Sequence, residues 1–278
     1  MDYKLGWGRS HPGHLVYLID LSGSMKKDNK IGQVMNALQN SLRVLLQRCT
    51  QGKALLERFT VTIIGYHSEI VPLFSGGVQE IKSLIMTAVS TGKPLFDYKE
   101  GGVAEPKWQT YMSNAFDEAR RDIEQWISTF KGKECPAPIV INITDGQPEE
   151  DGKDLDLCAN ETLLAARKLM SVRTSDGNVL LYNLHFGNSG NINEIILPIE
   201  MPNSTGDQRE DRRIQFLYNS SSVLTEKIAR VANSYEIPAH VGSHGMVSNV
   251  QDNALLVRLI EFSSGTGMVK DATETPKS

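Results

Sequence analysis

The chain has 278 residues, with 29 basic and 33 acidic side chains and a formal net charge of -4. This length is enough for a full hydrophobic core in one large domain. The nearly balanced charge, without a long basic run, excludes the electrostatic footprint of a nucleic-acid-binding protein. No apolar run approaches the roughly 20 residues that cross a bilayer. We therefore expect neither a nucleic acid nor a membrane as a partner.

The N-terminal stretch MDYKLGWGRSHPGH lacks the basic start and apolar centre of a secretion signal. Cys49, Cys135 and Cys158 are odd in number and far apart, with no C-x-x-C spacing. This argues against both a disulfide framework and a zinc site. The sequence thus predicts a cytoplasmic protein whose thiols are reduced and buried.

The first half of the chain begins with HLVYLID, residues 14–20, which is typical of a strand buried on both faces of a parallel sheet. From Ile31 onward the apolar residues recur at helical spacing, which predicts a helix, and residues 78–89 predict a second amphipathic helix. Between them, residues 58–68 and 69–74 predict two strands separated by a tight turn near Ser68, so one strand at the sheet edge is expected to be antiparallel. Residues 90–110 are rich in Gly and Pro and predict a long surface loop.

In the second half, strands alternate with helices again. Helices are predicted at residues 115–130, 161–170, 222–233 and 253–262, and strands at 139–144, 179–186 and 194–200. This alternation predicts a three-layer, doubly wound (Rossmann-like) α/β fold with a mainly parallel sheet. No linker divides the chain. We expect a single domain over residues 14–262, preceded by a segment at 1–13 and followed by a disordered tail at 263–278.

Two predicted strands end in an aspartate, Asp20 and Asp145. Ser22 and Ser24 follow Asp20 at alternate positions, so the three side chains can point the same way as the chain leaves the strand. In a doubly wound sheet, the carboxyl ends of the strands form the binding crevice. Carboxylates and hydroxyls are hard oxygen ligands that suit Mg²⁺, with Mn²⁺ or Ca²⁺ as competitors. Taken alone, D-x-S-x-S could equally be a turn that caps the helix starting near Asn29.

These motifs resemble the von Willebrand factor A family (vWA). Its metal-ion-dependent adhesion site has D-x-S-x-S after the first strand, a threonine in a later loop and an aspartate in a T-D-G context. The chain has DLSGS at 20–24, TYMSNAF from Thr110 and ITDG at 143–146. The resemblance covers residues 15–186, and residues 213–235 and 245–262 are similar to the C-terminal part of bacterial cytoplasmic members, including the tellurium-resistance-associated group. The family usually has Gly-Gly before the threonine, whereas this chain has Trp108-Gln109.

The resemblance implies a vWA-type fold and a binding module that is not an enzyme. The metal ligands that it implies are Asp20, Ser22, Ser24, Thr110 and Asp145. In the family, the serines bind the metal directly and the aspartates act partly through water. The threonine engages when a partner protein supplies an Asp or Glu carboxylate to the open position.

Other functions remain open from the sequence. A scaffold with the same residues could work without metal, and a Mg²⁺-dependent phosphotransferase or phosphatase could use Asp20, although Ser22 stands where such enzymes generally have a second acid. SMKK, residues 24–27, matches the S-x-x-K motif of penicillin-binding hydrolases without its companion motifs. The acidic run PEEDGKDLD, residues 148–156, is either a solvated loop or a rim that selects basic partners.

Overall fold

Strand β1 (Gly13–Asp20) is buried along all eight residues, as the apolar sequence predicts. It lies inside the central sheet of a computed structural model that describes residues 3–96, 109–186, 193–250 and 252–268. The other strands of the sheet are β4 (Phe59–Tyr66), β5 (Ile70–Gly77), β6 (Ile139–Thr144), β7 (Leu180–His185), β8 (Ile195–Ile196) and β9 (Met246–Ser248). A separate hairpin pairs β2 (Thr50–Gln51) with β3 (Ala54–Leu55). The helices are η1 (Gly23–Asn29), α1 (Lys30–Arg48), α2 (Val78–Thr91), α3 (Met112–Ser128), α4 (Leu155–Ser171), α5 (Gln208–Asn219), α6 (Glu226–Ser234), α7 (Asn253–Gly265) and η2 (Thr266–Met268).

The strand order is β5-β4-β1-β6-β7-β9-β8. β1 pairs in parallel with β4 on one side and with β6 on the other, and β6, β7 and β9 continue in parallel. β5 is antiparallel at one edge, as predicted, and the two-residue β8 is antiparallel at the opposite edge. The sheet is therefore mixed but mainly parallel, and the predicted α/β fold class is confirmed.

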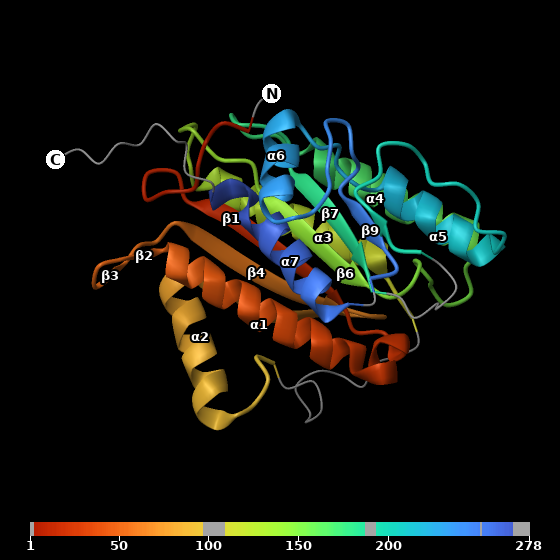
Figure 1. The fold of residues 1–278 in the computed structure, drawn as a ribbon, viewed down its shortest axis with the longest axis horizontal. Helices are drawn as coiled ribbons and strands as arrows, with labels where there is room; N and C mark the ends of the chain where they lie inside the picture. Colours follow the sequence, from red (N-terminus) through yellow and green to blue (C-terminus); the bar gives the residue numbers. More distant parts are fainter. Residues whose placement is uncertain (1–2, 97–108, 187–192, 251, 269–278) are drawn as a thin grey trace.

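Helices cover both faces of this sheet (Figure 1). Because side chains alternate along a strand, Tyr17 and Ile19 of β1 pack in the core under α1, α2, α6 and α7. Val16 and Leu18 pack on the opposite face, in the core under α3, α4 and α5. Burying such a side chain stabilises the fold by about 1.5–3 kcal/mol relative to leaving it exposed, so β1 anchors both layers.

Several elements differ from the sequence prediction. The sequence does not predict α5, because its first turns are charged and its buried apolar residues are few. It also does not predict β9 or the β2-β3 hairpin, because these strands are too short for their apolar residues to form a recognisable spacing. α4 begins at Leu155, earlier than predicted, because the Asp154 side chain accepts hydrogen bonds from two backbone N–H groups of its first turn. The prediction of a strand over residues 194–200 holds only for Ile195–Ile196.

The described residues on either side of the predicted domain, 14–262, pack against each other. α7 continues past residue 262 to Gly265, and Ser263 and Ser264 are fully buried. Trp7, also buried, donates its backbone N–H to the carbonyl of Gly267 at 2.8 Å. Residues 263–268 are thus helical where a disordered tail was predicted, and residues 269–278 lie outside the described part of the chain.

The predicted state of the cysteines is confirmed, since all three are buried and free. In the described part of the chain, no helix is both long and apolar enough to cross a membrane.

A chain of buried polar side chains ties the sheet together near the carboxyl ends of its strands. The Tyr66 hydroxyl donates to Asn142 Oδ1 at 2.8 Å, and Asn142 Nδ2 donates to Asn183 Oδ1 at 2.9 Å. Asn183 Nδ2 in turn donates to the Ser220 carbonyl at the end of α5. Because these groups are shielded from water, each bond lost would leave a buried polar group unsatisfied.

We predict that Asn142→Leu lowers the free energy of unfolding by about 2–4 kcal/mol, since it leaves the Tyr66 hydroxyl and Asn183 Oδ1 without their partner. Urea unfolding followed by circular dichroism measures this loss. The neighbouring change Ile141→Val is the control and should cost only about 0.5–1.5 kcal/mol. Equal losses in the two variants would contradict a special role for the polar chain.

Candidate metal centre

The register of β1 and β6 brings the two predicted acidic strand ends together. The last pair of this parallel ladder is Ile19 with Ile143, so Asp20 and Thr144 follow side by side. β4, the next strand of this sheet along the chain, lies on one side of β1, whereas β6 lies on the other side of β1. The pair β1 and β6 is therefore the topological switch point of the sheet, where doubly wound folds bind their ligands.

Asp20 is fully buried and held by two hydrogen bonds. Its Oδ1 accepts the backbone N–H of Ser22 at 2.8 Å, and its Oδ2 accepts the Thr144 hydroxyl at 2.7 Å. Burial and, secondarily, the negative charge of Asp145 raise the pKa of Asp20 to about 6, although the hydrogen bonds from Thr144 and Ser22 act in the opposite direction. A positive charge at this place would relieve the repulsion between the two carboxylates.

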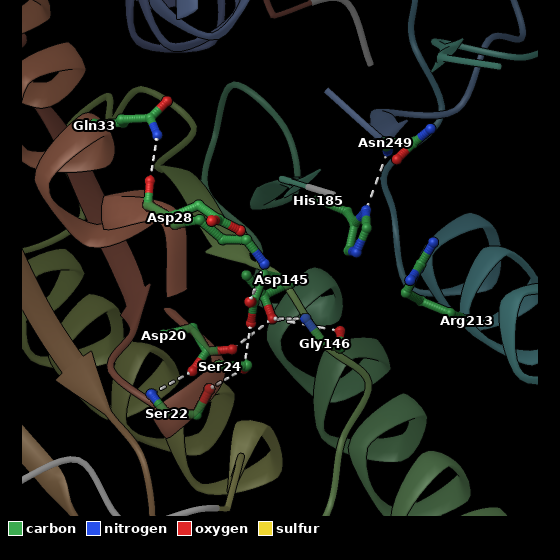
Figure 2. A network of polar contacts seen from close by, with 12 residues as sticks. Asp20, Ser22, Ser24, Asp28, Gln33, Asp145, Gly146, His185, Arg213 and Asn249 are labelled. Atoms are coloured by element: carbon green, nitrogen blue, oxygen red, sulfur yellow. Dashed lines mark hydrogen bonds and ion pairs between the residues drawn. The ribbon is translucent and has the colours of Figure 1, made fainter. Parts of the chain in front are cut away.

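The two serines link Asp20 to Asp145 (Figure 2). Ser24 donates its hydroxyl to Asp145 Oδ1 at 2.6 Å, and the Ser22 and Ser24 hydroxyl oxygens are 3.0 Å apart. Because the Ser24 proton is used by Asp145, the Ser22 hydroxyl is the donor in the second bond. Four of the five predicted ligands thus form one continuous group of oxygens.

Thr110, the fifth predicted ligand, is buried at the edge of this group. Its backbone pairs with that of Glu149, with N–H···O distances of 2.9 and 3.2 Å. The Thr110 hydroxyl lies beside Gly146, since a Cβ placed on this glycine would be 4.0 Å from Thr110 Oγ1. The loop that carries Thr110 is therefore held against the turn that follows Asp145. Trp108, part of the departure from the family pattern, lies outside the described residues.

Two further residues belong to the site although the sequence pattern assigns them no role. Thr144 orients Asp20 and accepts the N–H of Gly146 at 3.1 Å, which shapes the turn after β6. Lys30 Nζ forms an ion pair with Asp145 Oδ2 at 2.7 Å, and its side chain is only 8% exposed. A lysine in the first turn of a helix opposes the helix dipole, and this was the sequence signal that could have pointed to Lys30.

The backbone between η1 and α1 places Lys30 at this point. Asp28 and Asn29 both have left-handed conformations, with φ of 53° and 54°, so the chain turns sharply before α1 begins. Asp and Asn tolerate this conformation better than most residues. The Asn29 side chain packs over Gly32, where a Cβ would lie 2.5 Å from Asn29 Oδ1.

The donor set fits a hard divalent cation. Asp20 and Asp145 supply two carboxylates, and Ser22, Ser24 and Thr110 supply hydroxyls. Within the described ranges, no three His, Cys, Asp or Glu side chains gather in a group that could hold a metal. Any cation here would consequently be held by two acids and completed by hydroxyls and water, a set that suits Mg²⁺ or Mn²⁺ and not Zn²⁺.

The acidic run after Asp145 is partly used inside the fold. Glu150 accepts a hydrogen bond from the Ser113 hydroxyl and pairs with Lys153 at 2.6 Å, and Asp154 caps α4. Glu149 and Asp151 are exposed. Asp156 is exposed as well and lies 3.6 Å from Arg212. A rim that selects basic partners would therefore depend on these exposed acids.

Near the site, His185 is fully buried and accepts the backbone N–H of Asn249 at 3.1 Å. Burial and, secondarily, the positive charge of Arg213 hold its pKa well below the usual value, so the ring is neutral. Lys27 of the S-x-x-K match is exposed, while Ser24 is bound to Asp145.

No protein-family model matches the sequence, and no curated protein is significantly similar to it. Similarity to solved structures is found at low identity. The pilus adhesin SpaC from Lactobacillus rhamnosus GG in its open conformation has a TM-score of 0.53 at 13% identity, over 95% of this chain and 31% of SpaC. The ArnB paralog VWA2 from Sulfolobus acidocaldarius has a TM-score of 0.42 at 17% identity, over 90% of this chain and 44% of VWA2. The manganese-loaded TRAP protein of Plasmodium vivax has a TM-score of 0.42 at 22% identity, over 66% of this chain and 59% of TRAP.

The chain thus spans less than two thirds of the length of these proteins. At such identities the likeness concerns the fold alone. The likeness to SpaC, together with the strand order and the helices on both faces, gives the chain a vWA-type α/β fold.

We predict that Thr144→Val lowers the free energy of unfolding by about 1–3 kcal/mol at pH 8 in EDTA, because Asp20 Oδ2 loses its hydroxyl donor. The pKa of Asp20 is raised to about 6, so this carboxyl is ionised at pH 8 and largely protonated at pH 5. The loss should accordingly be smaller at pH 5, as measured by urea unfolding at both pH values. Thr162→Val is the control, since the buried Thr162 hydroxyl has no hydrogen-bond partner among the described residues, and it should be neutral or stabilising. A loss that is the same at both pH values would contradict the assignment.

Proposed function

We propose that the chain is a protein interaction module of the vWA family that binds Mg²⁺ and uses it to hold a carboxylate of a partner protein. Its ligands would be Asp20, Ser22, Ser24, Thr110 and Asp145. The observation that carries the proposal is the continuous group of oxygens from Asp20 through the serines to Asp145, at the switch point of the sheet. Mn²⁺ or Ca²⁺ would be the competing ions.

The chemistry of the ligands supports this function. A bound divalent cation would supply an electrophilic point for an incoming Asp or Glu carboxylate. Hydroxyl ligands are neutral, so they leave more of the cation's charge for the partner than a full set of carboxylates would. Asp20 is held in place by Thr144 and by the backbone N–H of Ser22, which orients the acid before any ligand arrives. These residues thus build a prearranged site for an outside carboxylate.

The setting of this module is also a proposal. We place it in the bacterial cytoplasm and in the tellurium-resistance-associated group, on the resemblance of residues 213–235 and 245–262 to such members. The partner is a protein that presents an acidic side chain, and no enzymatic activity is assigned.

A metal-independent scaffold is the second candidate. It is favoured by one observation, the ion pair that Lys30 already makes with Asp145. Partner binding that persists in EDTA would support the scaffold. A phosphotransferase or phosphatase ranks third, and turnover of a phosphate ester that disappears in Asp20→Ala would support it.

We predict that calorimetric titration of Mg²⁺ into the metal-free protein gives a single saturable site. The double variant Ser22→Ala/Ser24→Ala should bind at least about 10-fold more weakly, because two hydroxyl ligands are lost. Ser113→Ala, which removes a nearby hydroxyl that contacts Glu150 instead, is the matched control and should bind as the wild type does. Equal affinity in the double variant would contradict the assigned ligands.

We predict that acetate, as the simplest carboxylate, tightens Mg²⁺ binding in the same titration, and that Thr110→Val reduces this effect more than it reduces binding of Mg²⁺ alone. The physical reason is that Thr110 lies at the edge of the oxygen group and is expected to engage when the carboxylate arrives. Chloride at equal ionic strength is the control for screening. An acetate effect that Thr110→Val leaves untouched would remove Thr110 from the ligand set.

A further inference from the structure

Lys30 occupies a position that is unfavourable for a lysine in two ways. Its side chain is only 8% exposed, and removing an ammonium group from water is costly unless it is paired. It also stands in the first turn of α1, where the helix dipole disfavours a positive charge and which contains no acidic residue. The contact that offsets both costs is the ion pair with Asp145, whose side chain is 1% exposed.

We infer that Lys30 is a built-in competitor of the divalent cation: its ammonium group neutralises Asp145 in the metal-free protein and thereby sets the metal affinity of the site. The inference rests on the proposed function, which it deepens. Asp145 Oδ1 is engaged by Ser24 and Oδ2 by Lys30, so a cation that approaches Asp145 either displaces the ammonium group or binds close to it. Both cases weaken binding, since like charges repel strongly where water is excluded.

The charges around the site make this competition effective. Asp20 and Asp145 contribute two negative charges and Lys30 one positive charge, so the site carries about -1 with the lysine and about -2 without it. Arg213, which also interacts electrostatically with Asp145, is itself paired with Glu210. His185 is neutral. Lys30 therefore determines how much negative charge a metal ion meets.

This arrangement would couple the metal to the partner. A partner's carboxylate adds a negative charge at the open position and offsets the positive charge of Lys30, so metal and carboxylate would be retained together better than either alone. Without Lys30 the site would hold its metal ion even when no carboxylate is present. The lysine thus makes metal retention depend on the partner.

Two variants and one control test this inference. Lys30→Met removes the charge and keeps a chain of similar length, while Lys30→Gln removes the charge and keeps a hydrogen-bond donor for Asp145. Lys27→Met makes the same charge change at an exposed position three residues earlier and is the matched control. Each protein is titrated calorimetrically with Mg²⁺ and with Mn²⁺, with and without acetate, and its thermal unfolding is followed in EDTA and in Mg²⁺.

We expect Lys30→Met and Lys30→Gln to bind Mg²⁺ at least about 10-fold more tightly than the wild type, with a smaller gain from acetate, and Lys27→Met to match the wild type. In EDTA, Lys30→Met should unfold at a lower temperature than the wild type, and Mg²⁺ should raise that temperature more in the variant. If Lys30→Met folds only with metal, the metal affinity of Lys30→Gln can still be compared with that of the wild type.

Unchanged or weaker metal binding in both variants, with saturable binding in the wild type, would overturn the role of Lys30 and leave the proposed function standing. If neither the wild type nor the variants bind metal, with or without acetate, the proposed function and the inference both fail. Metal binding by the Lys30 variants but not by the wild type would support the inference, because it would show that Lys30 keeps the metal ion out of the wild-type site.

Discussion

Two buried carboxylates, Asp20 and Asp145, meet at the end of adjacent parallel strands, and the rest of the site depends on this juxtaposition. Negative charges that share a water-poor place repel one another, which contributes to the raised pKa of Asp20. Each carboxylate oxygen has a donor. Asp20 accepts from the Ser22 N–H and the Thr144 hydroxyl, and Asp145 accepts from Ser24 and Lys30. The ammonium group of Lys30 partly balances the charge of this buried pair of acids.

The scaffold below the site keeps this arrangement in place. β1 is buried on both faces, and the hydrogen-bonded chain from Tyr66 through Asn142 to Asn183 connects the strands on either side of it. Buried polar chains of this kind are satisfied only in one alignment of the strands, so they specify the alignment as well as stabilise it. If the site binds a ligand as proposed, this fixed alignment of the strands would lower the cost of ordering its oxygens.

A vWA-type fold does not by itself assign a function, since one fold can host many sites. What distinguishes this chain is the combination of neutral hydroxyls, two carboxylates and an internal ammonium group at the switch point. Under the proposed function, the hydroxyls would favour an exposed, reactive cation, whereas Lys30 would favour the metal-free state. A site with both features would respond to a carboxylate from outside more strongly than a site with only one of them.

The sequence by itself determined the fold class and four neighbouring members of the site. Alternating strands and helices left few topologies, and D-x-S-x-S and T-D-G each stand at the end of a strand, so Asp20, Ser22, Ser24 and Asp145 had to share one edge of the sheet. Short-range pattern also predicted the antiparallel edge strand β5. The sequence pattern could not predict α5 or the β2-β3 hairpin, because each has too few apolar residues to show the spacing of a helix or a strand.

Only the tertiary structure decided the role of Lys30. In the sequence it is one of three lysines before a helix, and two of them, Lys26 and Lys27, are exposed. Which lysine turns inward depends on the left-handed residues Asp28 and Asn29 and on the position of Asp145, more than a hundred residues away in the chain. Local sequence patterns report periodicity and turn chemistry, whereas the pairing of buried charges is a long-range interaction that exists only once the strands lie side by side.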